Sequence, residues 1–195
     1  MPDASRRAAP PGELDDLTVA RARQGDPGAS RALIERYQGP VHALLGRLLG
    51  PAGRGAEIDD LAQECFLRVF RALPRFQIQG PARLSTWILT IATRLAIDSL
   101  RRIRPDSLPH AIEESLAVDE REALRPEQRV LLAEVDALLS TLTPEYRAAF
   151  VLRIHHELSY REIAGLLGVE EGTIKSRIAR ARTALRDALE EVSHD

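Results

Sequence analysis

The sequence has little of several features that define common classes of protein. Cys65 is the only cysteine in 195 residues, so no disulfide can form within the chain, which fits a reducing compartment. Residues 1–12 lack the apolar stretch of a secretory signal. The longest apolar runs, such as Val41–Leu49, are short and interrupted by polar residues, so none is expected to cross a bilayer. We therefore expect a cytoplasmic protein with no membrane insertion.

The chain also lacks an overall basic excess and a recognisable catalytic motif. Its formal net charge is −2, so contact with nucleic acid has to come from a local basic patch. There is no glycine-rich phosphate loop and no nucleophile elbow, and the adjacent His155 and His156 lack the spacing of a two-histidine zinc motif. Cys65 falls on the apolar face of an expected helix, which indicates an inert buried thiol. We expect no enzymatic activity, and hence no catalytic residue, metal or cofactor.

Apolar residues recur at steps of three and four along most of the chain, which predicts an all-α fold. Residues 1–12 are rich in Ala, Pro, Arg and Gly and are expected to be disordered. Asp26 followed by Pro27 indicates a helix start, and Ser85 is expected to cap another helix. A first helical domain is expected over 13–104, with helices at about 14–23, 27–49, 57–73 and 85–102.

A change in composition then predicts a linker over residues 105–129. Residues 105–128 contain three prolines and seven acidic residues against two arginines, which is a net charge of −5. This predicts an acidic, flexible and mostly extended linker, and an ordinary solvated tether explains the same composition. A second helical domain is expected over 130–191. Its helices are expected at about 130–142, from Thr143-Pro144 to about 157, at 159–167, and at 170–191.

The segment 159–182 has the pattern of a helix-turn-helix. Ser159 and Glu162 form a possible capping box, Gly168 provides the turn, and a longer helix follows. The longer helix carries apolar residues at steps of four, three and four, which places them on one buried face. These residues are Ile174, Ile178, Ala181 and Leu185.

The other side of this helix is basic, with no acidic residue between Glu171 and Asp187. Such a helix is suited to the major groove, where Arg180 can read guanine and the later arginines can contact phosphate. A positively charged solvated face on a helical hairpin is the alternative. The residues expected to contact DNA are Thr173, Lys175, Ser176, Arg177, Ala179, Arg180, Arg182 and Arg186.

Two independent sets of motifs resemble the extracytoplasmic-function (ECF) sigma factors of bacterial RNA polymerase. Residues 158–177, from Leu-Ser-Tyr-Arg-Glu-Ile-Ala onward, resemble the promoter-reading C-terminal domain, and residues 142–150 resemble its start. Residues 59–66, Asp-Asp-Leu-Ala-Gln-Glu-Cys-Phe, resemble the polymerase-binding helix, and residues 84–102 resemble the promoter-melting helix. The resemblance covers about residues 14–191. It implies an alternative sigma factor that directs core RNA polymerase to minus-35 and minus-10 promoter elements.

The resemblance also implies partners and site residues in the first domain. Four residues of the third helix correspond to the face that grips the clamp of the polymerase's largest subunit, namely Asp60, Gln63, Glu64 and Leu67. The fourth helix and the loop before it correspond to the surface that melts the minus-10 element, with DNA contacts expected from Arg83, Thr90, Arg94, Arg101 and Arg102. Many relatives have asparagine at Arg94, so the resemblance carries no minus-10 sequence preference. An anti-sigma factor is a further expected partner.

Two other functions fit parts of the sequence. A free-standing helix-turn-helix regulator explains the second domain but leaves the polar face around Asp60 without a role. A helical adaptor protein leaves the basic stripe from Lys175 to Arg186 without a role. Trp87 has two interpretations, a core residue or a stacking platform for an unpaired base.

Overall fold

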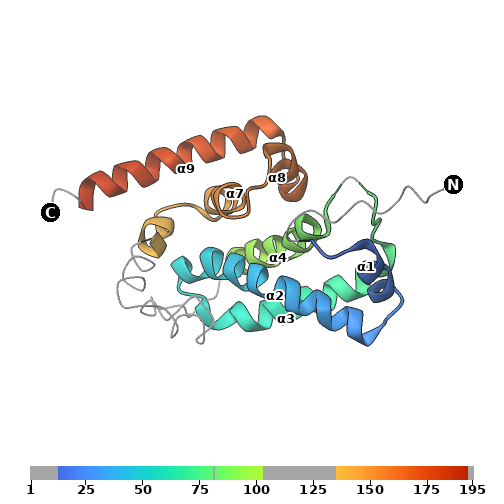
Figure 1. Cartoon of the computed structure of the whole chain (residues 1–195). Coiled ribbons are helices and arrows are strands. Elements are labelled where there is room, and N and C mark those ends of the chain that lie inside the picture. Colours follow the sequence, from blue (N-terminus) through green and yellow to red (C-terminus); the bar gives the residue numbers. More distant parts are fainter. Residues whose placement is uncertain (1–12, 81, 103–134, 193–195) are drawn as a thin grey trace.

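The computed structural model describes residues 13–80, 82–102 and 135–192, and in these ranges all regular structure is helical. In Figure 1, α2, α3 and α4 lie together, and α7 and α8 lie between them and the long helix α9. The helices are α1 (Asp16–Arg23), α2 (Pro27–Leu49), α3 (Ile58–Ala72), α4 (Leu84–Arg101), α7 (Pro144–Ile154), α8 (Tyr160–Leu167) and α9 (Glu171–Val192), with 3-10 turns η1 (Gly50–Ala52), η2 (Gly55–Glu57) and η3 (Leu73–Arg75) and a further helical stretch over 135–140.

Several helix starts follow the local capping chemistry of the sequence, but Thr143 stands at the N-cap of α7 without a side-chain capping hydrogen bond. The carboxylate of Asp26 accepts a hydrogen bond from the amide of Ala29 at 2.8 Å, as expected for a cap before a proline. Ser85 does not cap α4, and that prediction was wrong. The helix begins at Leu84, which is buried in the core, so Ser85 lies within the first turn and its hydroxyl donates to the carboxylate of Glu13.

The second expected helix of the C-terminal part also ends earlier than the sequence indicates. We expected it to run to about residue 157, whereas α7 ends at Ile154. The chain turns through Glu157, which has a positive φ of 54°, and this turn brings Leu158 into the core. Burial of Leu158 therefore competes with continuation of the helix, and burial prevails.

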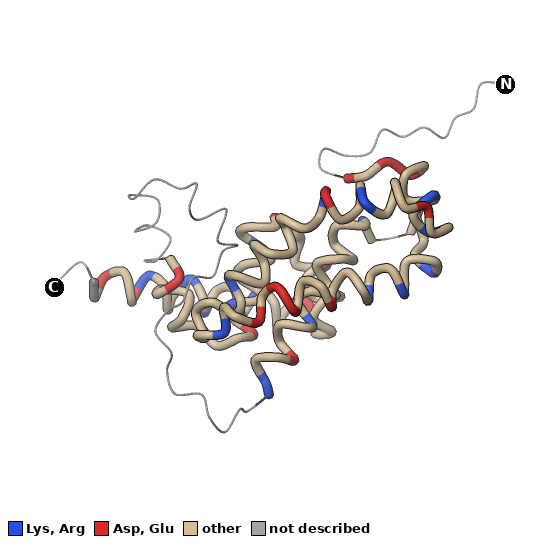
Figure 2. The backbone as a smooth tube through the Cα atoms, turned by 90° about the horizontal axis from the view of Figure 1, so that it is seen from below, with Lys and Arg blue, Asp and Glu red and all other residues tan. Residues whose placement is uncertain are grey.

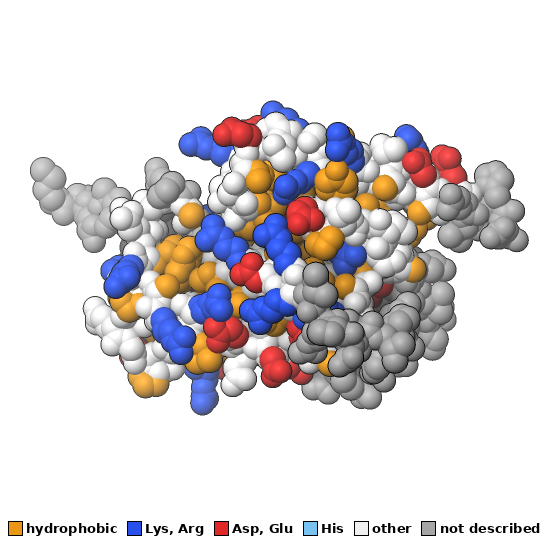
Figure 3. Space-filling model, turned by 180° about the vertical axis from the view of Figure 1, so that it is seen from behind, with side chains coloured by type: hydrophobic (Ala, Val, Ile, Leu, Met, Phe, Trp, Pro, Cys, Tyr) orange, Lys and Arg blue, Asp and Glu red, His pale blue; other side chains and the backbone are white. Residues whose placement is uncertain are grey.

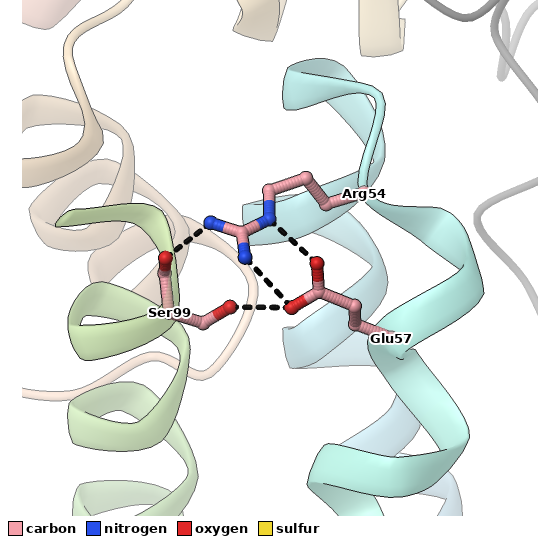
Figure 4. Close-up of polar contacts among 3 residues, drawn as sticks. All are labelled: Arg54, Glu57 and Ser99. Carbon is pink, nitrogen blue, oxygen red and sulfur yellow. Dashed lines mark hydrogen bonds and ion pairs between the residues drawn. The ribbon is translucent and has the colours of Figure 1, made fainter. Parts of the chain in front are cut away.

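Helices α1 to α4 form one unit, here called the N-terminal unit, whose core lies between α2, α3 and α4. A polar network closes one end of this core (Figure 4). Arg54 donates two hydrogen bonds, of 2.8 and 2.9 Å, to the carboxylate of Glu57 and a third to the backbone oxygen of Ser99. The Ser99 hydroxyl donates to the same carboxylate at 2.6 Å. The network fixes the start of α3 against the end of α4.

Residues 135–192 form a second unit, here called the C-terminal unit, and it packs directly on the first. Helix α7 contacts α2 and α4, and α8 contacts α4. One cluster of buried apolar residues runs through both units. Within the described part of the chain, no helix has the length and apolar character needed to cross a membrane. The fold therefore places the helix-turn-helix next to the surface of α4.

Candidate nucleic-acid and protein interfaces

The helix-turn-helix forms as its sequence pattern predicts. The Ser159 amide donates to the Glu162 carboxylate at 2.8 Å, and the Glu162 amide donates to the Ser159 hydroxyl at 3.2 Å, which completes the capping box. Gly168 ends α8 with a φ of +67°, a left-handed conformation that glycine adopts at little cost. After the turn α9 packs against α8, and its first residues, Glu171 and Gly172, are exposed.

The predicted buried face of α9 is confirmed. Ile174, Ile178 and Ala181 are fully or almost fully buried, and Leu185 is partly buried against the same core. The opposite side of the helix is therefore free to meet a partner. Of the residues expected to contact DNA, Lys175, Ser176, Ala179, Arg180, Arg182 and Arg186 are exposed, and Thr173 and Arg177 are half-buried.

Several of these exposed side chains are already oriented by neighbours. The Tyr146 hydroxyl accepts a hydrogen bond of 3.0 Å from Arg180, and this bond raises the pKa of the guanidinium. Lys175 lies 2.9 Å from the Glu171 carboxylate, which raises the pKa of the amine. No sequence pattern indicates a role for Tyr146, because the bond joins residues of different helices that are 34 positions apart. The contact orients Arg180, and its remaining donors are available for other acceptors.

The face of α3 expected to bind polymerase is accessible. Asp60 and Gln63 are exposed, and Leu67 has 47% of its surface exposed among these polar neighbours. Glu64 is half-buried and pairs with Arg68 at 2.7 Å. The surface combines acidic, amide and aliphatic groups, which suits a protein partner better than DNA.

The α4 surface is shared with the C-terminal unit. Arg83, Arg94, Arg101 and Arg102 are exposed, and the half-buried Thr90 donates its hydroxyl to the Thr86 carbonyl at 2.8 Å. Arg94 Nε points to the backbone oxygen of Leu166 in α8 at 3.4 Å. Arg101 Nη2 lies 3.3 Å from a carboxylate oxygen of Glu145 in α7. The structure thus joins two predicted minus-10 contacts to the C-terminal unit.

Arg83, a third residue of this surface, affects the pKa of Glu162 in α8 through its charge. Burial raises the pKa of Glu162, but hydrogen bonds from Ser159 and the charge of nearby Arg83 outweigh burial, so the pKa is lowered overall. Arg83 and Glu162 line the same cavity of about 490 Å³, which contains residues of both units. Figure 3 shows a face on which Lys and Arg side chains gather with a few acidic and apolar groups between them. Figure 2 shows both signs of charge along the backbone of both units.

Arg147 is a structural residue to which the sequence analysis assigned no role. It is 3% exposed and donates to the backbone oxygens of Leu139, Leu142 and Leu48 at 2.9, 3.0 and 2.8 Å. Leu48 belongs to the last turn of α2, where carbonyls lack helical partners and a cation is favoured. Burial lowers the pKa of Arg147 to about 10, and Asp136 partly opposes this. Arg147 therefore fastens the C-terminal unit to the end of α2.

Trp87 and Cys65 belong to the core or its edge. Trp87 is half-buried, packs on the core and stacks at a tilt on Phe76, with ring centroids 5.0 Å apart. Cys65 is fully buried, as expected, and burial raises the pKa of its thiol to about 12, which disfavours the reactive thiolate. His156 lies at the edge of the cavity between the units. Burial, then His155 and Arg47, lower its pKa to about 4. Among the described residues, no group of three or more His, Cys, Asp or Glu is arranged to hold a metal ion.

Comparison with known proteins gives consistent matches over both units. Residues 33–105 match the Sigma-70 region 2 family, and residues 132–185 match the Sigma-70, region 4 family. The chain is 38% identical over 160 residues to ECF RNA polymerase sigma factor SigE of Mycolicibacterium smegmatis, covering 80% of this chain and 60% of that protein. It is 32% identical over 184 residues to ECF RNA polymerase sigma factor SigW of Bacillus subtilis, covering 89% of this chain and 96% of that protein. The solved structure of CnrH in complex with the cytosolic domain of CnrY is similar with a TM-score of 0.64 and 25% identity, covering 90% of this chain and 96% of that chain.

Proposed function

The chain belongs to the ECF RNA polymerase sigma factors, and we propose from this premise which surface carries out each step of initiation. As an alternative sigma factor it binds core RNA polymerase and directs promoter-specific transcription initiation. Sigma factors are initiation factors, and we assign no catalytic step to this chain itself. Its place of action is the cytoplasm, where polymerase and DNA are found. The domain boundaries that we propose are 13–104, a linker over 105–129, and 130–191.

The exposed face of α3 is the proposed contact with core polymerase. Asp60 and Gln63 are exposed, and Leu67 supplies an aliphatic group between them. A polar surface with one central apolar side chain can give both specificity and desolvation energy in a protein interface. The clamp of the largest subunit is the proposed partner, and Glu64 completes the face.

The surface of α4 is the proposed site of minus-10 melting. Opening a base pair costs a few kcal/mol, and this cost is offset when the displaced strand gains phosphate and stacking contacts. Arg83, Arg94, Arg101 and Arg102 supply cationic groups along one helix and its leading loop, and all four are exposed. Thr90 lies between them with its hydroxyl bonded to its own helix. This spacing allows several consecutive phosphates to be held.

Helix α9 is the proposed reader of the minus-35 element. The observation that carries this assignment is the confirmed burial of Ile174, Ile178 and Ala181, because it fixes the basic side of the helix outward. Arg180 lies in the half nearest the turn and is oriented by Tyr146, so it is the proposed base contact. Arg182 and Arg186 lie further along and are the proposed phosphate contacts.

An anti-sigma factor is a further proposed partner. CnrH, which shares the fold over nearly its whole length, was solved in complex with the cytosolic domain of CnrY. Burial of one or more of the three surfaces above by such a partner would prevent initiation. This proposal is tested by whether a purified anti-sigma domain competes with core polymerase for the chain.

The decisive test of the proposed function is transcription in vitro from a genomic promoter library, with core polymerase in the presence and absence of the chain. The chain should select a defined set of promoters only when core polymerase is present. To test the α4 surface, Arg101→Ala with Arg102→Ala should reduce open complexes on closed duplex, and a pre-melted bubble should restore them at least partly. Equal defects on both templates would argue against a role in melting.

A further inference from the structure

We propose that Glu13 is a positioning residue for minus-10 recognition, because its carboxylate caps the first turn of α4 and thereby fixes Arg83 and the loop before this helix. The inference rests on the proposed function, since it concerns the surface assigned to the minus-10 element. It adds to that surface a residue that lies 72 positions earlier in the chain than Ser85, to which it is bonded. Glu13 acts through α4 and makes no contact with DNA itself.

The start of α4 has no capping side chain of its own. Its N-cap residue is Arg83, whose side chain makes no capping hydrogen bond. The first amides of a helix lack partners within the helix, and this end of the helix carries partial positive charge. An acceptor from another part of the chain, preferably an anionic one, therefore stabilises this helix start.

Glu13 supplies that acceptor. Its carboxylate accepts a hydrogen bond of 3.3 Å from the amide of Ser85 and a second one from the Ser85 hydroxyl. Figure 1 shows the chain before α1 running to the start of α4. Asp15 and Asp26 cap α1 and α2 in the same way, but each of them directly precedes its helix. Glu13 is thus a helix cap supplied from a distant segment.

Tyr37 holds the Glu13 carboxylate in place. The Tyr37 hydroxyl donates to this carboxylate at 2.9 Å and accepts from the amide of Leu14 at 3.3 Å. Tyr37 belongs to the core and is 2% exposed, so its ring is fixed on α2. Burial raises the pKa of the hydroxyl, and the charge of Glu13 adds to this rise, so the hydroxyl stays protonated and remains a donor. The carboxylate is therefore held between a buried donor of α2 and the first turn of α4.

The first turn of α4 in turn determines where Arg83 lies. The Arg83 carbonyl accepts a hydrogen bond of 3.0 Å from the amide of Trp87, so its backbone is fixed only while this turn is formed. In the loop before α4, the amide of Gly80 donates to the carbonyl of Gln77 at 2.9 Å, and a Cβ at Gly80 would lie 2.9 Å from the same oxygen. This tight turn holds itself, whereas the end of the loop next to Arg83 depends on α4. Fraying of the helix start would therefore displace both.

The test uses holoenzyme formed with the full-length chain and compares Glu13→Ala with Asp16→Ala. Asp16 is exposed in the first turn of α1, so the control removes the same charge from the same segment. Binding is measured to a fragment of a promoter that the parent holoenzyme selects, with its minus-10 element unpaired, and to single-base variants of that element. Glu13→Ala should weaken binding to the parent fragment roughly three- to tenfold, as expected for a lost helix cap, and reduce the preference over the variants. Binding to a duplex with only the minus-35 element should stay unchanged, and Asp16→Ala should alter none of these quantities.

A rescue separates capping from a general role of Glu13 in folding. Ser85→Asp in the Glu13→Ala chain places a carboxylate on the first turn of α4 itself, where the helix N-terminus favours it. This double variant should recover most of the lost minus-10 preference. Tyr37→Phe keeps the buried ring and removes only the donor that holds Glu13. It should give a smaller loss in the same direction, and it replaces Glu13→Ala if that variant does not fold.

An unchanged minus-10 preference in Glu13→Ala and Tyr37→Phe holoenzymes would overturn the positioning role and leave the proposed function intact. Equal losses on the minus-10 and minus-35 fragments that Ser85→Asp does not recover would also overturn it, because they would indicate a general loss of fold. If the parent holoenzyme shows no preference among the minus-10 variants, the assignment of the α4 surface fails, and the positioning role fails with it.

Discussion

Replacing Arg147 by methionine should strongly destabilise the C-terminal unit. The guanidinium donates three hydrogen bonds to backbone oxygens, and bonds from a charged donor contribute roughly 1.5–3 kcal/mol each. Burying the charged guanidinium costs free energy and offsets part of this stabilisation. Burial lowers the pKa of the guanidinium to about 10, which corresponds to about 3 kcal/mol. The difference is a net loss of roughly 1.5–6 kcal/mol in the free energy of unfolding. Methionine fills much of the volume but leaves the oxygens of Leu48 and Leu142 without this donor.

The assay uses the single tryptophan as a reporter of one unit. Urea unfolding is followed by Trp87 fluorescence, which reports the N-terminal unit, and by circular dichroism, which reports both units. Arg147→Met should shift the circular dichroism transition to lower urea, ahead of the fluorescence transition. The control is Arg161→Met on exposed α8, which should change stability by less than about 0.5 kcal/mol. If Arg147→Met unfolds like the parent chain by both probes, the burial cost cancels the hydrogen bonds and Arg147 is not the fastening residue.

Three further outcomes are expected. Arg180→Ala should weaken binding to the cognate minus-35 element by roughly 1–3 kcal/mol and relax the sequence preference at one or two bases, whereas Arg186→Ala should weaken binding to all sequences alike and lower the salt slope by about one. Both effects are measured as holoenzyme binding to single-base variants of the element at two salt concentrations. A uniform loss of affinity for Arg180→Ala would contradict its role as a base contact. Replacing Asp60 and Gln63 together with arginine should weaken core polymerase binding while circular dichroism stays native, and unchanged affinity would exclude this face. The pKa of His156 is about 4 in the folded chain and about 6.5 in the unfolded chain, so the unfolded chain takes up the proton first as the pH falls. The free energy of unfolding should therefore fall by about 2 kcal/mol between pH 7 and pH 5. In urea titrations, His156→Gln should lack most of that fall.

The helices and their caps could be predicted because their causes are local in the sequence. The spacing of Ile174, Ile178 and Ala181 fixes a buried face whatever that face packs against. The Ser159–Glu162 capping box depends only on residues three apart. Ser85 shows the limit of such reasoning. Ser85 does not occupy the N-cap because the helix begins one residue earlier, at Leu84, whose burial in the core stabilises the fold more than a serine cap would.

The joint between the units could not be predicted because it depends on which surfaces meet. Arg147 and Glu145 lie one turn or less after a predicted helix start, and nothing in their spacing separates a buried arginine from an exposed one. Arg147 is buried only because the end of α2, 99 residues earlier, offers a carbonyl at the right place. The pairing of Arg101 with Glu145 likewise spans 44 residues. Candidate DNA contacts could be named from the sequence, but their partners in the C-terminal unit could not.

Arg94 lies where the two units meet. Its long, charged side chain reaches from α4 to the Leu166 oxygen at 3.4 Å. The hydrogen bond is long and therefore weak, and Arg94 remains exposed, so the side chain can exchange this acceptor for a phosphate. The same residue would then contribute both to the contact between the units and to the proposed strand binding on the promoter. Substitution by asparagine would remove both effects at once, so DNA affinity alone would understate each of them. Only a measurement that reports separation of the units beside DNA binding can resolve the two contributions of this side chain.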